Sequence, residues 1–322
     1  MADLGRVALV HDYLNQYGGA ERVVEVLLDM FPGAPLYTSL YDPSRMPTSL
    51  QGLEPQTTFL QRLPFCHRAP RCLLPLYPRA FARLDLTGFD LLLSSSSAFA
   101  KCISPPPAAV HVCYCHTPMR FVWCYHDYVA RERLGPAVRV VLPLMIRRLR
   151  AWDLATAATV HEFIANSQFV AERIQRAYGR SSTVIYPPVE CDRFEVADGV
   201  EDYFLIVSRL RPYKRVDLAV RAFNELGLPL KIVGSGADEG RLRAMAGGTV
   251  ELVGRVSEAE LRHLLSHCRA LIFPGVEDFG LAPVEAQASG RPVIAFAGGG
   301  ALETVKEGET GLFFREPTAE SL

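Results

Sequence analysis

Two basic residues stand just beyond a predicted strand in the segment VSRLRPYKR. The strand is expected to end at Ser208, so Arg209 and Lys214 would lie past its carboxyl end, five residues apart. Two cations at this spacing suit a diphosphate, which carries its charge on two phosphorus centres. A single arginine or lysine is more often a solvated surface residue, so the prediction depends on where this pair stands.

A second segment, GVEDFGLAPVEAQASG, combines two acidic residues with a predicted helix start. Pro283 suits the first turn of this helix, and Gly290 suits its C-terminal cap. The helix N-terminus would direct free backbone N–H groups toward an anion. Glu277 lies on the loop before the helix and Glu285 eight positions later. We interpret them as hydrogen-bond acceptors for different hydroxyls of an extended polyol, not as a catalytic pair.

Two glycine-rich segments follow predicted strands. The first, AGGGALETV, indicates either a close backbone approach to phosphate or a flexible turn. The second, IVGSGADEGRL, superficially resembles a dinucleotide-binding fingerprint. Its third glycine comes late and no partner acid follows at the required distance, so we do not expect NAD to bind here.

These segments belong to a chain in which short β-rich runs alternate with helix-length segments. Amphipathic helices are predicted at 20–31 and 216–226. The predicted strands are 7–10, 35–40, 90–94, 110–115, 163–166 and 183–186, followed by 203–208, 230–233, 249–253, 270–273 and 292–296. Such alternation predicts the α/β class, with two parallel sheets in series that form two Rossmann-like units.

The break between the two units is expected within YPPVECDRFEVADG, which carries paired prolines and no periodicity. We place the domains at 1–197 and 198–322. A nucleotide-type ligand would bind in a cleft between them, at the carboxyl ends of the strands. The sequence ends at PTAESL soon after a strand-like GLFF, so the second domain is expected to lack its closing helices.

The composition is that of a soluble globular protein with 322 residues, 49% of them hydrophobic and 21% charged. The formal net charge of −1 gives no indication of a nucleic-acid partner. Eight cysteines occur without a C-x-x-C pair, so we expect reduced thiols and no metal site. The N-terminus does not resemble a signal peptide, and no apolar run reaches membrane-spanning length. We therefore expect a cytoplasmic protein, attached at most to a membrane surface.

Two segments of the first half are both basic and apolar. Residues 62–84 hold five arginines and no acid, and residues 131–152 hold six arginines and one glutamate. This pattern suits contact with anionic lipid headgroups. It equally suits helices whose arginine stems pack on the protein while their charged ends stay in water.

In order and spacing, the motifs resemble those of the retaining family 4 glycosyltransferases, which have the two-domain GT-B fold. The resemblance is carried by SRL…K, by the two glutamates with seven residues between them, by the FGL turn and by the GG-ALE loop. It also includes GGAER at 18–22, HTP at 116–118 and NS at 166–167. Within the family, HDYL and CHTPMRFVW are most similar to bacterial mannosyltransferases of O-antigen and exopolysaccharide assembly.

This resemblance implies a role for each matching residue. Arg209 and Lys214 would bind the donor diphosphate, Glu285 the ribose hydroxyls and Glu277 the transferred sugar. His116 would lie near the donor sugar and the acceptor, and Asp12 is a further acceptor-side candidate. The remaining donor-binding positions implied are Gly18, Gly19, Gly254, Arg255, Val256, Phe279, Gly280 and Leu281.

The resemblance also implies the reaction: a hexose, with mannose from GDP-mannose as the leading case, moves to a glycan or lipid-linked acceptor with retention. UDP-sugars stay open as donors. No metal or other cofactor is expected, because two fixed cations can neutralise the leaving diphosphate. Two alternatives remain, a sugar-nucleotide epimerase of the same fold and a non-catalytic subunit that binds a sugar nucleotide.

Overall fold

The computed structural model describes residues 5–64, 66, 70–124 and 136–322. The chain divides into two compact units, Met1–Pro188 (unit 1) and Val189–Leu322 (unit 2). This division lies before the predicted boundary at 197/198. The reason is that the segment ahead of that boundary packs on unit 2: Arg291 Nη2 donates to Ala197 O at 3.0 Å, and Phe194 packs against the unit 2 core.

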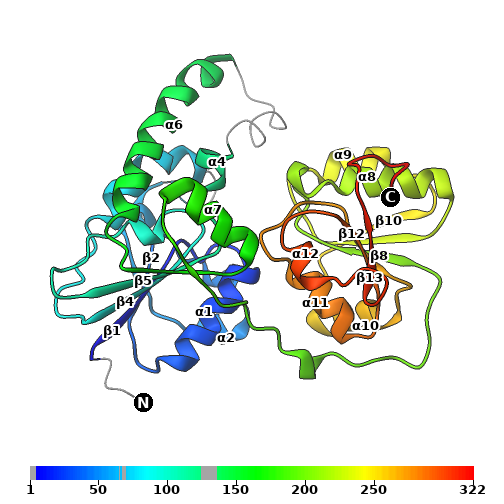
Figure 1. Ribbon diagram of the computed structural model, residues 1–322, viewed down its shortest axis with the longest axis horizontal. Helices are drawn as coiled ribbons and strands as arrows, with labels where there is room; N and C mark the ends of the chain where they lie inside the picture. The colour runs from blue at the N-terminus through cyan, green and yellow to red at the C-terminus, as the bar shows by residue number, and fades with distance from the viewer. Residues whose placement is uncertain (1–4, 65, 67–69, 125–135) are drawn as a thin grey trace. The chain divides into compact units, whose positions relative to one another are not determined.

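Unit 1 is built on a seven-stranded sheet in which all pairings are parallel, in the order β3-β2-β1-β4-β5-β6-β7 (Figure 1). The strands are β1 (Val7–His11), β2 (Leu36–Thr38), β3 (Gln56–Thr57), β4 (Leu91–Ser96), β5 (Val110–Cys115), β6 (Glu162–Ala165) and β7 (Thr183–Val184). Six of them fall on predicted segments, and only the two-residue β3 has no counterpart in the prediction.

The described helices of unit 1 connect and cover these strands. They are α1 (Gly19–Met30), α2 (Thr48–Gln51), α3 (Tyr77–Phe81), α4 (Arg120–Trp123), α6 (Pro136–Ala157) and α7 (Gln168–Tyr178), with short 3₁₀ turns η1 (Pro43–Arg45), η2 (Phe59–Arg62), η3 (Pro70–Leu76) and η4 (Ala100–Cys102). The NS motif starts α7, because Ser167 Oγ accepts from the Val170 N–H at 3.1 Å. Gly179 ends the helix with a left-handed φ of 65°.

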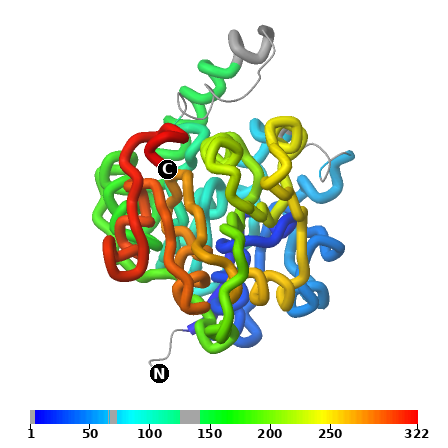
Figure 2. The backbone as a smooth tube through the Cα atoms, turned by 90° about the vertical axis from the view of Figure 1, so that its right-hand side faces the viewer, coloured from blue at the N-terminus to red at the C-terminus, as the bar shows by residue number. Residues whose placement is uncertain are grey.

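Unit 2 contains a second parallel sheet in the order β10-β9-β8-β11-β12-β13. Its strands are β8 (Phe204–Val207), β9 (Leu230–Val233), β10 (Val250–Gly254), β11 (Leu271–Phe273), β12 (Val293–Phe296) and β13 (Gly311–Phe314). Its helices are α8 (Val216–Leu226), α9 (Glu239–Met245), α10 (Glu258–His267), α11 (Leu281–Ala288) and α12 (Ala301–Thr304). Its 3₁₀ turns are η5 (Cys191–Arg193) and η6 (Pro212–Lys214). The strand-like GLFF is β13, which pairs with β12 at one edge of the sheet (Figure 2).

In both sheets the chain first winds one way and then returns to add strands on the other side. The reversal falls between β1 and β4 in unit 1 and between β8 and β11 in unit 2. Loops that leave the carboxyl ends of these two strand pairs diverge to opposite faces, which leaves room for a ligand. Each unit therefore has one topological switch point, and the functional residues can be sought there.

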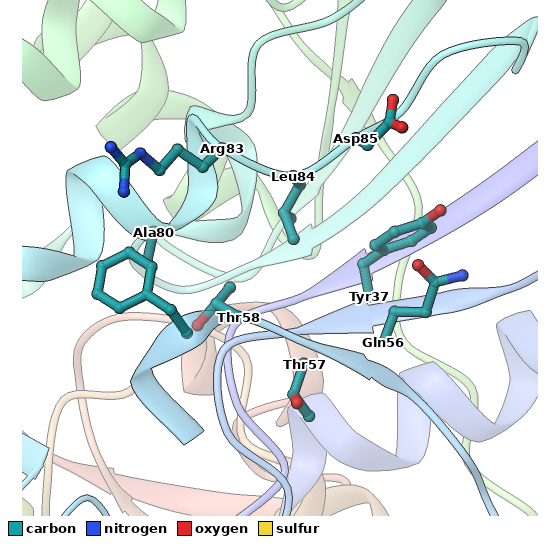
Figure 3. Close-up of a pocket in the computed structure, with 9 residues that line it drawn as sticks. Tyr37, Gln56, Thr57, Thr58, Ala80, Arg83, Leu84 and Asp85 are labelled. Atoms are coloured by element: carbon teal, nitrogen blue, oxygen red, sulfur yellow. The ribbon is translucent and has the colours of Figure 1, made fainter. Parts of the chain in front are cut away.

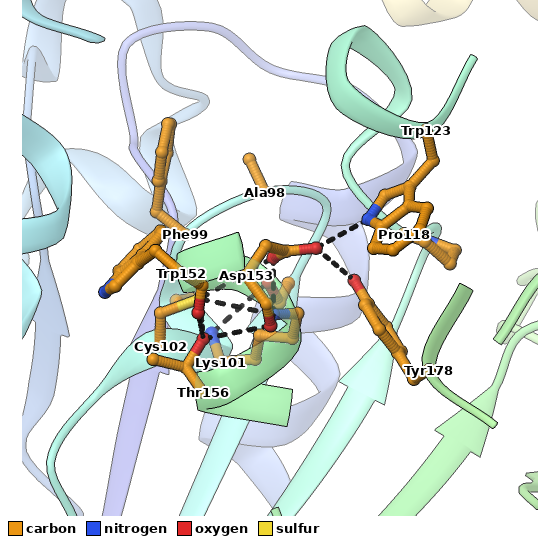
Figure 4. A network of polar contacts seen from close by, with 12 residues as sticks. Ala98, Phe99, Lys101, Cys102, Pro118, Trp123, Trp152, Asp153, Thr156 and Tyr178 are labelled. Atoms are coloured by element: carbon orange, nitrogen blue, oxygen red, sulfur yellow. Dashed lines mark hydrogen bonds and ion pairs between the residues drawn. The ribbon is translucent and has the colours of Figure 1, made fainter. Parts of the chain in front are cut away.

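A buried ion pair between Lys101 and Asp153 connects η4 to α6 in unit 1. Lys101 Nζ lies 2.6 Å from Asp153 Oδ1, and Asp153 Oδ2 accepts from Trp123 Nε1 at 2.6 Å and from the Tyr178 hydroxyl at 2.9 Å (Figure 4). Burial lowers the pKa of Lys101, but the adjacent Cys102 and Asp153 together outweigh this effect, and the pKa is raised. One carboxylate thus fixes η4, α4 and α7 to α6.

Among the described residues, no helix is long and apolar enough to cross a membrane. The 22-residue α6 has the length, but arginines interrupt its apolar residues.

His111 on β5 gives a direct test of the core of unit 1. The side chain is fully buried, and its Nε2 lies 2.8 Å from Ser94 Oγ. Burial, with smaller contributions from Lys101 and His161, lowers the pKa of His111 to about 3. An unfolded chain takes up this proton near pH ~6.5, so the contribution of His111 to stability is present above that pH and is lost as the pH falls toward 3.

We expect the free energy of unfolding to fall by about 2 kcal/mol more in the wild-type protein than in His111→Asn when the pH drops from about 7 to about 5. Urea titrations followed by tryptophan fluorescence measure this in unit 1, because both tryptophans, Trp123 and Trp152, lie there. An equal fall in the two proteins would show that His111 does not stay neutral when folded.

Candidate functional site

The switch point of unit 2 carries an ion pair between the two loops that leave it. Lys214 ends η6 after β8, and Glu277 lies on the loop after β11. Lys214 Nζ and Glu277 Oε2 are in direct contact, with side chains only 10% and 19% exposed. The structure therefore joins two predicted site residues that are far apart in the sequence.

Glycines hold the loops around this ion pair in close backbone contact. A Cβ on Gly275 would lie 2.7 Å from Lys214 O, and Cβ atoms on Gly234 and Gly236 would overlap the carbonyl oxygens of Ser208 and Leu210. The IVGSG segment thus packs against the SRL loop, where Leu210 N donates to Ser235 O at 3.0 Å. This contact requires glycine at positions 234 and 236.

The GG-ALE loop packs in the same way on the loop that holds Glu277. A Cβ on Gly299 would overlap Glu277 O, and one on Gly300 would overlap the backbone of Phe279. Gly300 N also donates to Glu277 O at 2.9 Å. The sequence indicated either a phosphate contact or a flexible turn for these glycines. In the structure they allow a fixed contact between two loops and so position Glu277.

The predicted helix after FGL is α11, and it begins at the carboxyl end of β11. Gly280 precedes it with φ of 86°, in a space where a Cβ would lie 2.7 Å from the Phe273 ring. Pro283 lies in its first turn and Gly290 follows its end with φ of 72°, as predicted. Glu285 is on the buried side of the helix and is 3% exposed.

The other predicted donor residues surround the same edge of the sheet. Arg209 is exposed directly after β8. Gly254 ends β10 with φ of 86°, and its carbonyl accepts from Gly234 N at 2.7 Å. Arg255 is exposed and Val256 is partly buried against the unit 2 core. Cations and backbone groups therefore follow the carboxyl ends of β8, β10 and β11 in one sheet, which is the chemistry an anionic nucleotide requires.

In unit 1, Asp12 lies at the corresponding switch point, after β1, but it is 1% exposed. Its two carboxylate oxygens accept four backbone N–H groups, from Ser97, Ala98, Phe99 and Ala100, at 2.5 to 2.9 Å. These contacts use the carboxylate to hold the loop after β4 in place. Asp12 thus orders the loop after β4, and its acceptor-side role stays a prediction.

His116 follows β5 and faces the same region of unit 1. It is 8% exposed, its Nε2 lies 2.8 Å from Ser95 Oγ, and its ring meets the edge of Tyr114 at 5.2 Å between centroids. Gly18 and Gly19 form the start of α1, the helix that follows β1. All of these predicted positions therefore follow the carboxyl ends of neighbouring strands.

Three buried residues around His116 are absent from the sequence-based prediction: His11, Glu21 and Ser95. His11 and Glu21 occur inside the quoted motifs HDYL and GGAER, which was a usable signal. Ser95 lies in a run of four serines at the end of β4, and no local feature distinguishes it from its neighbours.

A cavity of about 350 Å³ opens elsewhere on unit 1, beside β2 and β3 (Figure 3). It is lined by Tyr37, Gln56, Thr57, Thr58, Phe59, Ala80, Arg83, Leu84 and Asp85. None of these is among the predicted site residues. Burial, and to a smaller extent Asp85, raises the pKa of Tyr37, but the cavity does not include the switch-point residues His11 or Asp12.

Two protein-family models match the chain along almost its whole length. The model described as Glycosyltransferase Family 4 matches residues 17–193, and that described as Glycosyl transferases group 1 matches residues 191–322. The chain belongs to glycosyltransferase family 4. The predicted family is thereby confirmed, and this result does not favour the epimerase alternative.

Among curated proteins, D-rhamnosyltransferase WbpZ from Pseudomonas aeruginosa is 28% identical over 206 residues, 58% of this chain and 52% of that protein. The alpha-1,3/1,6-mannosyltransferase ALG2 from Dictyostelium discoideum is 23% identical over 385 residues, 98% of this chain and 87% of that protein. A D-inositol 3-phosphate glycosyltransferase from Streptomyces avermitilis is 28% identical over 211 residues, which is 55% of this chain and 43% of that protein. The chain thus matches about half the length of the first and third relatives.

Solved structures of similar fold include HepE from Anabaena in complex with UDP and glucose. The TM-score is 0.70 at 18% identity, over 98% of this chain and 87% of that chain. Sucrose-phosphate synthase from Thermosynechococcus elongatus has a TM-score of 0.72, also at 18% identity, with the same coverage. This likeness concerns the fold, and it confirms the predicted pair of Rossmann-like GT-B domains.

Proposed function

We propose that the chain moves a hexose, mannose in the first instance, from a nucleotide diphosphate donor to a glycan or lipid-linked acceptor. Anomeric configuration is retained and no metal is required. The observation that carries the proposal is the contact between Lys214 and Glu277 at the switch point of unit 2. Membership of glycosyltransferase family 4 supports the reaction class.

The donor diphosphate would bind Lys214 and Arg209, which follow the carboxyl end of β8. Lys214 is 8% exposed, so its charge is only weakly screened by water and acts strongly on a nearby phosphate. Arg209 is exposed and can turn toward the second phosphate. Two cations held in this way stabilise the leaving nucleotide as its negative charge develops.

The incoming diphosphate would compete with Glu277 for Lys214, and this competition gives Glu277 a second role. When the phosphate takes up part of the Lys214 charge, the Glu277 carboxylate can accept hydrogen bonds from hydroxyls of the transferred sugar. Glu285 on α11 is assigned to the ribose hydroxyls, and backbone groups of residues 279–281 to the sugar and phosphate. Residues 254–256 would lie beside the base, and Gly18 and Gly19 would approach the phosphates.

Transfer with retention proceeds as a front-face displacement. The bond from the anomeric carbon to the diphosphate oxygen breaks, a bond to the acceptor hydroxyl oxygen forms on the same face, and the hydroxyl proton passes to the leaving phosphate oxygen. The transition state resembles an oxocarbenium ion. His116 is assigned to the sugar and acceptor, which it would contact by hydrogen bonding.

Mannose is favoured by the mannosyltransferase named among the relatives. The donor we propose for it is GDP-mannose, which the resemblance in sequence motifs implies. HepE, in contrast, was solved with UDP-glucose, and the rhamnosyltransferase acts on another sugar by its name. The assay below therefore includes both bases.

The test is turnover of GDP-mannose and of UDP-glucose without metal, in a chelator, with a panel of glycan and lipid-linked acceptors. We expect GDP-mannose to be consumed only when acceptor is present. Lys214→Ala should lower kcat by about 100-fold or more, because a fixed charge that stabilises the transition state is lost. Lys306→Ala, at a surface lysine paired with Glu309, is the matched control and should be close to wild type.

Conversion of the donor to an epimer without acceptor would contradict transfer and support the isomerase. Nucleotide binding without turnover with any acceptor would support a non-catalytic subunit. A loss of thermal stability in Lys214→Ala that accounts for its loss of turnover would count against the assignment of Lys214.

We also propose that unit 1 contacts an anionic membrane surface through α6. Its described outer face exposes Leu144 and Leu154, at 55% and 46%, with the exposed Arg147 and Arg148 between them. The opposite face buries Ile146 and Leu149 in the core. Of the other four arginines predicted in this segment, those at 131 and 133 lie outside the described residues, and the side chain at 139 is not described. Arg150 Nη2 donates to Val122 O at 2.7 Å. An exposed stripe of leucine and arginine suits lipid headgroups.

Charge reversal of both residues, Arg147→Glu with Arg148→Glu, should weaken co-sedimentation with vesicles of phosphatidylglycerol and phosphatidylcholine. The expected loss is about tenfold or more, because each basic residue near an anionic surface contributes about 1 kcal/mol. Arg243→Glu with Arg269→Glu, in unit 2, is the control. Binding that does not depend on anionic lipid would rule out this contact.

A further inference from the structure

Four buried polar side chains form a continuous series in unit 1 and end at His116. In order they are Glu21, His11, Ser95 and His116, with exposures of 3%, 1%, 1% and 8%. They come from α1, β1, β4 and the loop after β5, around the switch point of the sheet. The parallel register places His11 directly opposite Ser95.

The contacts of Ser95 determine where the protons lie. His11 Nδ1 is 3.1 Å from both the backbone carbonyl oxygen and the Oγ of Ser95. A carbonyl oxygen can only accept, so His11 Nδ1 carries a hydrogen. Ser95 Oγ accepts from that N–H and donates its own hydrogen to His116 Nε2 at 2.8 Å. His116 Nε2 is therefore an acceptor, and the neutral ring carries its hydrogen on Nδ1.

The other end of the series faces a carboxylate. Glu21 Oε1 lies 3.7 Å from His11 Nε2, and this nitrogen is buried without a hydrogen-bond partner among the described residues. A carboxylate oxygen accepts hydrogen bonds, so Glu21 is the acceptor that this nitrogen faces. Glu21 lies in the first turn of α1, where the helix dipole stabilises negative charge. The contacts of Nδ1 with Ser95 orient the His11 ring, and Glu21 lies against its other nitrogen.

We propose that Glu21, His11 and Ser95 are positioning residues that hold His116 as its Nδ1-protonated tautomer. The inference rests on the proposed function only in placing His116 beside the reacting sugar. It refines that role: His116 presents a hydrogen-bond donor at Nδ1, so it binds a sugar or acceptor oxygen and does not remove the acceptor proton through that nitrogen. The oxygen of the departing phosphate is therefore the group that takes up the acceptor proton.

The test is the tautomer of His116 in long-range ¹H–¹⁵N NMR spectra of protein with labelled histidine. The spectra are recorded about two pH units above the ordinary histidine pKa of ~6.5, where the ring is neutral. His116→Gln serves to assign the signal. We expect the Nδ1–H pattern in the wild type and a shift toward the Nε2–H pattern in Ser95→Ala, which lacks the donor to Nε2. Ser95→Thr keeps a hydroxyl and should retain the wild-type pattern.

Ser94→Ala is the matched control, because Ser94 is the adjacent buried serine on β4 and contacts His111 instead. It should leave the His116 tautomer unchanged. An Nε2–H pattern in the wild type, or an unchanged pattern in Ser95→Ala, would overturn the inference. Because the spectra need no substrate, this outcome is independent of whether sugar transfer itself is found.

Turnover gives a second readout. In Ser95→Ala we expect kcat to fall by between about 10-fold and 100-fold, the usual cost of removing a hydrogen-bond partner that fixes a histidine tautomer. The donor KM should stay near the wild-type value. Ser95→Thr should recover most of the loss. A change in the donor KM alone, with kcat unchanged, would contradict a positioning role.

Discussion

The ion pair between Lys214 and Glu277 is the contact on which the organisation of the unit 2 site depends. It joins the loops that leave β8 and β11, the strands between which the sheet reverses its direction. Neither residue could reach the other without close backbone packing, which Gly275, Gly299 and Gly300 permit. The cation is thus kept buried and paired, in a place where a phosphate can compete for it.

In unit 1, buried contacts likewise hold the loops at the switch point, but they involve different side chains. Asp12 follows β1 at the switch point and uses its carboxylate to hold the loop after β4. That loop leads into Lys101, whose ion pair with Asp153 fixes the helices around it. These buried contacts hold Ser95 and His116 in a defined geometry. In both units, parallel strands bring residues from distant parts of the sequence to one edge.

Most of the fold could be predicted from the sequence, because buried parallel strands form apolar runs and the helices between them show their periodicity. β3 could not be predicted, since its two residues, Gln56 and Thr57, are polar and exposed. The positions of Lys214 and Glu277 at strand ends were also predictable, since each follows a recognisable strand. Their direct contact was not, because it depends on how two loops pack.

The series that ends at His116 shows more clearly which contacts cannot be predicted from the sequence. His11 and Ser95 meet because β1 and β4 pair in one particular register, and a shift of one residue would turn Ser95 to the other face of the sheet. Register is a property of the folded sheet, so four consecutive serines could not reveal which of them contacts a histidine. The surroundings of Asp12 were hidden for a similar reason: its acidic side chain was visible in the sequence, but the four N–H groups that surround it were not.

The central claim is that a nucleotide diphosphate binds at Lys214, and calorimetric titration with GDP and with UDP, in a chelator, tests it most directly. The account predicts that Lys214→Ala weakens binding of the preferred nucleotide by about 10-fold to 100-fold, the range expected for a charge-assisted hydrogen bond. Glu277→Gln should bind that nucleotide as tightly as the wild type or more tightly, because Lys214 is no longer shared with a carboxylate. Wild-type affinity in Lys214→Ala would contradict the account.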